Sequence, residues 1–173
     1  RTRLDAPDVA VSVSETEMTT SPGPSPLAQF SIGSDTYFGD DSGRQAALAA
    51  MAQLAAASDD ASMQVELTVK QAVDHFEHDR YDAALQTAQR ALDRLRGRID
   101  AVSEAALLLE LGATLKALGR IDEAEAHLSV ALERYRDTSP LKLANCAYWL
   151  CQCAIERGDL ARADELCELS LAA

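Results

Sequence analysis

The chain has 173 residues, a formal net charge of −12, and a composition that is 47% hydrophobic but only 5% aromatic. This length accommodates one domain of ordinary size, whose core we expect to form by close helix packing rather than around large rings. The acidic charge disfavours nucleic acid as a partner because phosphates would be repelled, and no apolar run reaches the roughly 18–20 residues that span a bilayer, which excludes a membrane-spanning helix.

Residues 1–41 differ in composition from the rest of the chain. They contain four of the five prolines and many serine, threonine and aspartate residues, without a helical period. This composition predicts an irregular or flexible N-terminal arm. One short segment of the arm groups large apolar side chains, which makes it a candidate to dock on the protein's own groove or on a partner. The segment contains Leu27, Phe30, Ile32, Tyr37 and Phe38.

Helices are predicted in series from residue 42 onward, from apolar spacing at helical intervals and from start and stop residues. Asp100 or Ser103 can start one helix and Ser139-Pro140 opens another, whereas Gly119 and Gly158 are stop signals. No strand pattern is found. Because the loops have only two to five residues, consecutive helices must lie antiparallel. The expected helices span approximately residues 42–57, 61–77, 81–96, 101–118, 121–135, 140–157 and 160 to the end.

One local pattern recurs three times: a turn, a large apolar residue, two mostly polar residues and then an alanine. The alanines are Ala84, Ala124 and Ala163, which lie 40 and 39 residues apart. Self-similarity at such a period is the sequence signature of a helical repeat array. We therefore predict an all-α, antiparallel helix-pair solenoid over residues 42–173, with one preceding helix and about three repeats at residues 61–98, 100–137 and 139–173.

The three copies resemble the tetratricopeptide repeat, whose consensus is W-x2-L-G-x2-Y followed by A-x3-F-x2-A. The middle repeat matches best, with Leu108-x2-Leu111-Gly112-x2-Leu115 in its first helix and Ala124-x3-Leu128-x2-Ala131 in its second. The last repeat has Ala147-x2-Leu150-Cys151-x2-Ala154 and Ala163-x3-Cys167-x2-Ser170, and the first keeps Ala72 and Ala84-x3-Ala88-x2-Ala91. The resemblance covers residues 61–173 and implies a superhelix of helix pairs.

The small residues of the pattern have a packing role. Gly112, Ala72 and Cys151 are expected midway along each first helix, at the place where the second helix crosses closely. Ala84, Ala124 and Ala163 are expected on the other side of the same crossings. A large side chain at either place would push the two helices apart.

The resemblance also implies that the first helices line a concave face that binds other proteins. The groove positions that it implies are Val69, Lys70, Val73, Phe76, Leu109, Ala113, Lys116, Asn145, Tyr148, Trp149 and Gln152. For Phe76 and Trp149, packing between repeats is an equal alternative. Some members grip a C-terminal carboxylate with polar residues, but the matching positions here are mostly apolar. We therefore expect an amphipathic helix or an extended apolar segment as ligand, with Lys70 and Lys116 at the edge of the groove.

No constellation of catalytic, cofactor-binding or metal-binding groups is found, so we predict neither an enzyme nor a cofactor. His75 and His78 share a helix face, but their i, i+3 spacing without a third ligand favours solvated side chains over a metal site. The four cysteines form no C-x-x-C pair, and we interpret them as reduced, small apolar core residues, which fits a cytoplasmic protein. They are Cys146, Cys151, Cys153 and Cys167.

These features together predict a protein–protein interaction module. The repeat is longer than the usual 34 residues, and such long variants resemble those of bacterial regulators and multidomain signalling proteins. We therefore expect the regulatory or sensory N-terminal part of a larger signalling protein, for example ahead of a nucleotide cyclase or a transcriptional output domain. The apolar helix face at Leu169–Ala173 also leads us to expect that the parent protein continues.

Two alternatives for the function stay open. One is a free-standing adaptor or chaperone, and the other is a homodimerisation module in which the apolar last helix pairs across a two-fold axis. In each case the partner is a protein or peptide, which includes the chain's own arm and an attached output domain.

Overall fold

The computed structural model describes residues 41–172, apart from the side chain of Asp41, and every regular element within them is a helix. The predicted helix bounds agree with the structure to within one residue. The predicted arm, with the docking segment at Phe30, Ile32, Tyr37 and Phe38, lies outside the described residues, except that Asp41 already begins α2. The helices are α2 (Asp41–Ala57), α3 (Ala61–Glu77), α4 (Tyr81–Leu95), α5 (Ala101–Ala117), α6 (Ile121–Tyr135), α7 (Pro140–Arg157) and α8 (Leu160–Ala172).

The helices begin and end at residues with local capping roles. Asp60 accepts hydrogen bonds from two first-turn N–H groups of α3, at 2.8 and 3.4 Å. Asp100 accepts one from the Ser103 N–H at 2.6 Å, so Asp100 is the residue that starts α5. Gly119 and Gly158 follow α5 and α7 with φ of 74° and 77°, a backbone conformation that glycine adopts without the strain other residues incur.

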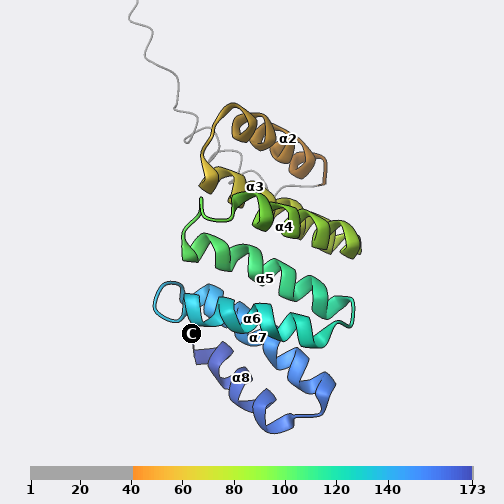
Figure 1. Cartoon of the computed structure of the whole chain (residues 1–173). Coiled ribbons are helices and arrows are strands. Elements are labelled where there is room, and N and C mark those ends of the chain that lie inside the picture. Colours follow the sequence, from red (N-terminus) through yellow and green to blue (C-terminus); the bar gives the residue numbers. More distant parts are fainter. Residues whose placement is uncertain (1–40, 173) are drawn as a thin grey trace, which may run out of the picture.

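The helices stack in chain order, and each packs against its neighbours in the sequence, as in a helical solenoid (Figure 1). In addition, α3 contacts α5 and α5 contacts α7, whereas α4, α6 and α8 make no comparable contacts with one another. The stack therefore has two layers. We call α3, α5 and α7 the first-helix layer, and α4, α6 and α8 the second-helix layer.

The centre of the core is α5, which contacts α3, α4, α6 and α7. The spacing of Leu108, Leu111, Leu115 and Leu118 predicts one apolar stripe along this helix, and the first three of these side chains are buried. Leu118 follows the helix and is partly exposed. Leu107 and Leu109 lie outside that stripe but are 0% and 3% exposed. The wider burial has a physical reason, because a helix with neighbours on four sides has almost no face left for solvent.

Helices α5 and α6 cross at Gly112. A methyl group at Gly112 would overlap Leu128 Cγ and would lie 2.7 Å from Leu128 Cδ2 and 3.2 Å from the Ala124 carbonyl oxygen. Ala124 and Leu128 are both fully buried. This confirms the packing role predicted for the small residues of the middle pair. The residues at the equivalent positions of the other pairs are also buried: Ala72 and Ala84 in the first, Cys151 and Ala163 in the third.

Helix α2 is attached to α3 by an apolar and a polar contact. Met51 and Met63 form a small core of their own, separate from the main one. Nearby, the carboxylate of Asp74 is 3% exposed and accepts hydrogen bonds from Arg80 at 2.7 Å and from Gln45 at 3.2 Å. The buried charge is thus compensated by a cation and an amide, which a buried carboxylate requires. It joins α2, α3 and the turn after α3.

We predict that Ala124→Leu lowers the free energy of unfolding by about 1–3 kcal/mol, because the added carbon atoms would fall within the α5–α6 crossing. The matched control is Ala126→Leu, which makes the same change at an exposed position of α6 and should stay within about 0.5 kcal/mol of the wild type. Urea denaturation of both variants measures the difference. Equal stability of the two variants would contradict the crossing at Ala124.

Candidate functional site

The predicted groove residues all lie on the first-helix layer, but they differ in accessibility. Tyr148 is 49% exposed, Asn145 is exposed as well, and Leu109 and Ala113 are only 3% and 5% exposed. Leu109 and Ala113 therefore form the floor beneath the surface and offer little contact area themselves. The remaining seven are partly exposed: Val69, Lys70, Val73 and Phe76 on α3, Lys116 on α5, and Trp149 and Gln152 on α7.

An open pocket of about 420 Å³ lies between α3, α5 and the start of α7. Its walls are mainly aliphatic, and Val102 of α5 is 41% exposed there. Val69 and Lys70 were predicted as groove residues and both line the pocket. The sequence analysis did not identify the other lining residues, because their spacing does not show which helix ends lie next to one another. The lining residues are Ser62, Val65, Glu66, Val69, Lys70, Val102, Ser103, Ala106, Tyr135, Ser139 and Lys142.

Four aromatic side chains form a cluster, three of them on this layer and the fourth, Tyr81, at the start of α4. The rings of Phe76 on α3 and Trp149 on α7 meet edge to face with centroids 5.7 Å apart. Tyr81 packs against Phe76 at 5.2 Å, and Tyr148 packs against Trp149 at 5.1 Å. Such edge-to-face pairs are favourable beyond the area that they bury. Phe76 and Trp149 thus pack between repeats and link two helices of the layer that have α5 between them.

Glu110 is a charged residue of the first-helix layer that the sequence analysis did not single out. It lies on α5, one turn after Ala106 of the pocket and one turn before Ala113. Burial raises the pKa of its carboxyl group to about 7, although the nearby Lys142 ammonium lowers it. The group is therefore partly protonated at neutral pH. In the sequence, the only sign of its burial is its position between two small inner residues. A lone glutamate in a helix usually indicates a solvated face, so this sign is weak.

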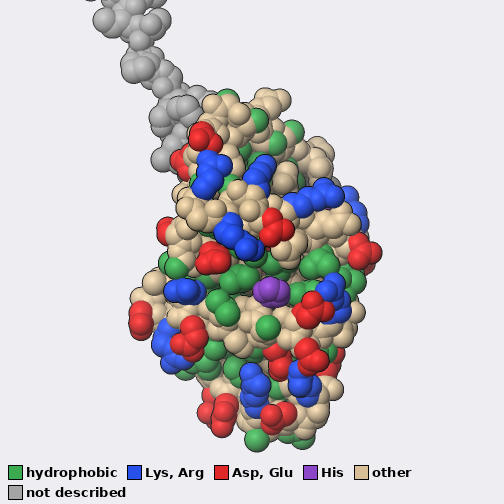
Figure 2. Space-filling view, in the orientation of Figure 1, with side chains coloured by type: hydrophobic (Ala, Val, Ile, Leu, Met, Phe, Trp, Pro, Cys, Tyr) green, Lys and Arg blue, Asp and Glu red, His purple; other side chains and the backbone are tan. Residues whose placement is uncertain are grey.

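The other charges of the layer are largely compensated. The Lys116 ammonium, expected at the groove edge, lies 2.8 Å from a carboxylate oxygen of Glu156, and the Lys116 side chain is only 20% exposed. At the pocket, Glu66 lies together with Lys70 and Lys142, so neither sign of charge dominates there and apolar contacts must supply most of any binding energy. On the face in view in Figure 2, where α4 and α6 lie in front, acidic and basic side chains are likewise interspersed, with hydrophobic side chains between them.

The histidines partly depart from the sequence-based expectation. His78 is exposed, as expected, and its Nδ1 lies 2.7 Å from the Asp74 carbonyl oxygen. His75 is half-buried instead of solvated, and burial, together with the Arg80 charge, lowers its pKa. Within the described residues, no group of three or more histidine, cysteine, aspartate or glutamate side chains is placed to hold a metal ion.

The cysteines follow the expectation with one exception. Cys146, Cys151 and Cys153 are buried in α7 as small apolar core residues, and all four thiols are free. Cys167 on α8 is exposed, which corrects the expectation that all four belong to the core. The reason is that, among the described helices, only α7 makes extensive contact with α8.

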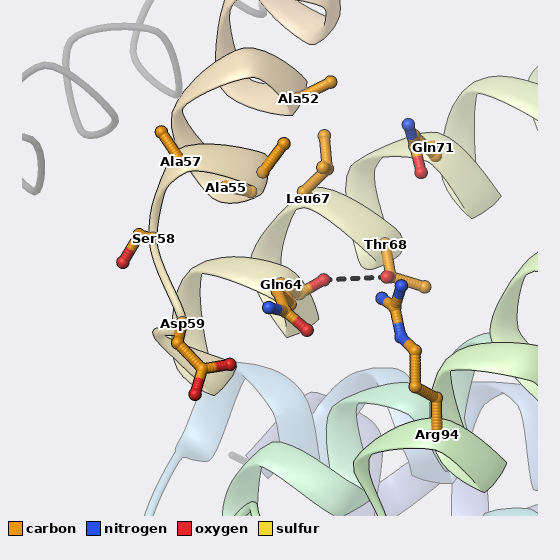
Figure 3. Close-up of a pocket in the computed structure, with 11 residues that line it drawn as sticks. Ala52, Ala55, Ala57, Ser58, Asp59, Gln64, Leu67, Thr68, Gln71 and Arg94 are labelled. Atoms are coloured by element: carbon orange, nitrogen blue, oxygen red, sulfur yellow. Dashed lines mark hydrogen bonds between the residues drawn. The ribbon is translucent and has the colours of Figure 1, made fainter.

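A second open cavity of about 540 Å³ lies between α2 and α3 (Figure 3). Alanines of α2 line one side, and Arg94 extends from α4 towards α3. The Thr68 hydroxyl already donates to the Gln64 carbonyl oxygen at 2.7 Å. None of the predicted groove residues lines this cavity, so the pocket on the first-helix layer is the better candidate site.

No protein-family model matches the chain, and no curated protein matches it. Among the described residues, no helix combines the length and the apolar character needed to cross a membrane.

We predict that Glu110→Gln stabilises the protein in a pH-dependent way. Because the pKa of Glu110 lies above its ordinary 4.5, the folded state keeps a proton that the unfolded state releases. Wild-type stability therefore falls as the pH rises from about 4.5 to 7. The variant should be more stable by on the order of 3 kcal/mol at alkaline pH and no more stable than the wild type at acidic pH.

Thermal unfolding over this pH range measures the difference between the two proteins. Glu104→Gln makes the same change at an exposed position of α5 and serves as the control. A gain for Glu110→Gln that is independent of pH would show that burial of the charge is not its cause.

Proposed function

We propose that residues 61–172 form a tetratricopeptide-type superhelix and that its first-helix layer binds a segment of another protein. The contact between Phe76 and Trp149 is the observation that carries this proposal. Side chains from α3 and α7 can meet across α5 only if the stack curves towards the first-helix layer. The helix contacts agree, because the helices of this layer approach one another and those of the second-helix layer do not.

The proposed ligand is an amphipathic helix or an extended segment with apolar side chains. Val65, Val69, Val102 and Ala106 give the pocket aliphatic walls, which suit an apolar anchor. The charged residues at the pocket are of both signs, with Glu66 beside Lys70 and Lys142. A strongly acidic or strongly basic ligand would therefore meet a repulsive neighbour as well as an attractive one.

In this proposal the chain is an interaction module and not an enzyme. Binding at the first-helix layer would bias an output domain attached to the same protein, as expected for the regulatory part of a bacterial signalling protein. A partner segment that binds the curved form of the stack more tightly than other forms would stabilise that form. A free-standing adaptor would use the same surface without an output domain.

The test compares two valines that carry the same substitution on opposite layers. Val102 lines the pocket on α5 and is 41% exposed, and Val130 lies on α6 and is 45% exposed. Peptides are first selected on the wild-type protein from a random peptide library, and a peptide of residues 27–38 is added as a further probe. Calorimetry then gives the affinity of each peptide for Val102→Lys and Val130→Lys.

We expect Val102→Lys to weaken binding at least tenfold, because a buried ammonium group would replace an apolar contact. Val130→Lys should bind like the wild type. The proposal fails if both variants bind equally well, or if the selected peptides lack apolar anchors.

Homodimerisation is a second candidate function, favoured by the exposed leucines of α8. Leu160 is 66% exposed, Leu169 36% and Leu171 86%, and only Ala163 and Leu166 of this helix are buried. Exposed apolar side chains on one helix are typical of a surface that another chain or element covers.

Light scattering over a range of concentrations tests the dimer. A dimer formed through α8 should dissociate in Leu169→Lys but persist in Val130→Lys, because Val130 lies at an open surface of α6 beside Ser129, Glu133 and Arg134, with no residue of α8. A wild-type protein that stays monomeric at every concentration excludes this second function.

A further inference from the structure

Two cysteines meet where α7 and α8 pack together. Cys151 is 5% exposed on α7, and Cys167 is exposed on α8. Burial raises the pKa of Cys151, and the neighbouring Cys167 thiol raises it further. The two side chains therefore lie close together, and both thiols are free.

The position of this pair in the fold explains why the two side chains lie close together. Cys151 and Cys167 occupy the places that Gly112 and Leu128 occupy in the pair α5–α6, where an added Cβ at Gly112 would overlap the Leu128 side chain. The close crossing thus brings this residue pair together by the geometry of the repeat. A disulfide requires Cβ atoms about 3.5–4.5 Å apart, which only such close approaches supply.

The other two cysteines have different surroundings. Cys146 and Cys153 are both 0% exposed. The charged neighbours of Cys146 are Lys142 and Glu110, and those of Cys153 include Glu125 and Lys116. Burial raises the pKa of both thiols, to about 12 and about 11. An oxidant in solvent therefore has access to Cys167 alone, and the nearest second thiol is that of Cys151.

We propose that Cys151 and Cys167 are a modification site, at which a reversible disulfide joins α7 to α8 when the protein meets an organic disulfide such as oxidised glutathione. The exposed Cys167 thiolate attacks one sulfur of the oxidant, which forms a mixed disulfide and releases one glutathione thiol. Cys151 then gives its proton to solvent and attacks the Cys167 sulfur, which releases the second glutathione. Two protein thiols are oxidised, and the one S–S bond of the oxidant is reduced to two thiols.

The bond would stabilise the last helix pair. It closes a short loop around the α7–α8 turn and so restricts the unfolded chain. Because α7 also carries Tyr148 and Trp149, oxidation would hold one end of the first-helix layer in its folded form. Reduction by excess thiol would reverse the effect.

The experiment uses the full chain, reduced and then treated with oxidised glutathione. Trypsin cleaves after Lys142, Arg157 and Arg162, so Cys151 falls in the peptide 143–157 and Cys167 in the peptide that begins at Ala163. Mass spectrometry without reduction should find these two peptides joined by a disulfide, and the joined species should disappear after reduction. The oxidised protein should also melt at a higher temperature than the reduced protein.

Variants identify the partner of Cys167, because the peptide 143–157 also contains Cys146 and Cys153. Cys151→Ala should abolish the joined peptides and the gain in melting temperature, and Cys153→Ala should keep both. The proposal is overturned if the wild type gives no joined peptides, if they persist in Cys151→Ala, or if Cys167 links two copies of the chain.

Discussion

The close crossing within each helix pair is the constraint on which the rest of the structure depends. At Gly112, α5 and α6 approach so closely that even a methyl group would overlap Leu128. This approach buries Ala124 and Leu128 completely and makes α5 the centre of the core. Since the same positions recur in the pairs before and after it, one local rule sets the spacing of the whole stack. The proximity of Cys151 and Cys167 follows from the same rule, because they occupy the positions of Gly112 and Leu128 in the last pair.

The two layers of the stack differ in what they expose. The first-helix layer combines an aliphatic pocket, an aromatic contact across α5 and one glutamate whose pKa is raised by burial. A core designed for stability alone would not place a carboxylate there, because burial disfavours its charged form. Locally unfavourable groups of this kind are expected at sites retained for binding. Glu110 lies on α5 one turn after Ala106 of the pocket, but it does not line the pocket itself.

The helices could be predicted from the sequence because they depend on local signals. The features that could not be predicted depend on tertiary contacts. Asp100 starts α5 by accepting a hydrogen bond from the nearby Ser103 N–H, and Gly119 ends it by adopting a positive φ. Both effects involve only residues close together in the sequence, so the sequence alone predicts them. The burial of Leu107, the raised pKa of Glu110 and the contact of Phe76 with Trp149 depend on helices far away in the sequence. The groove positions Leu109 and Ala113 illustrate the difference, since the layer was predicted but their burial beneath its surface was not.

The most direct test of the account is a nuclear Overhauser measurement between the α protons of Gly112 and the methyl groups of Leu128. These groups are far apart in the sequence, so cross-peaks between them arise only if α5 and α6 cross at Gly112. The account predicts strong cross-peaks from both α-carbon protons or from the one that faces α6. Their absence, in a protein whose spectrum is otherwise well dispersed, would contradict the close crossing and with it the stacked architecture derived from it.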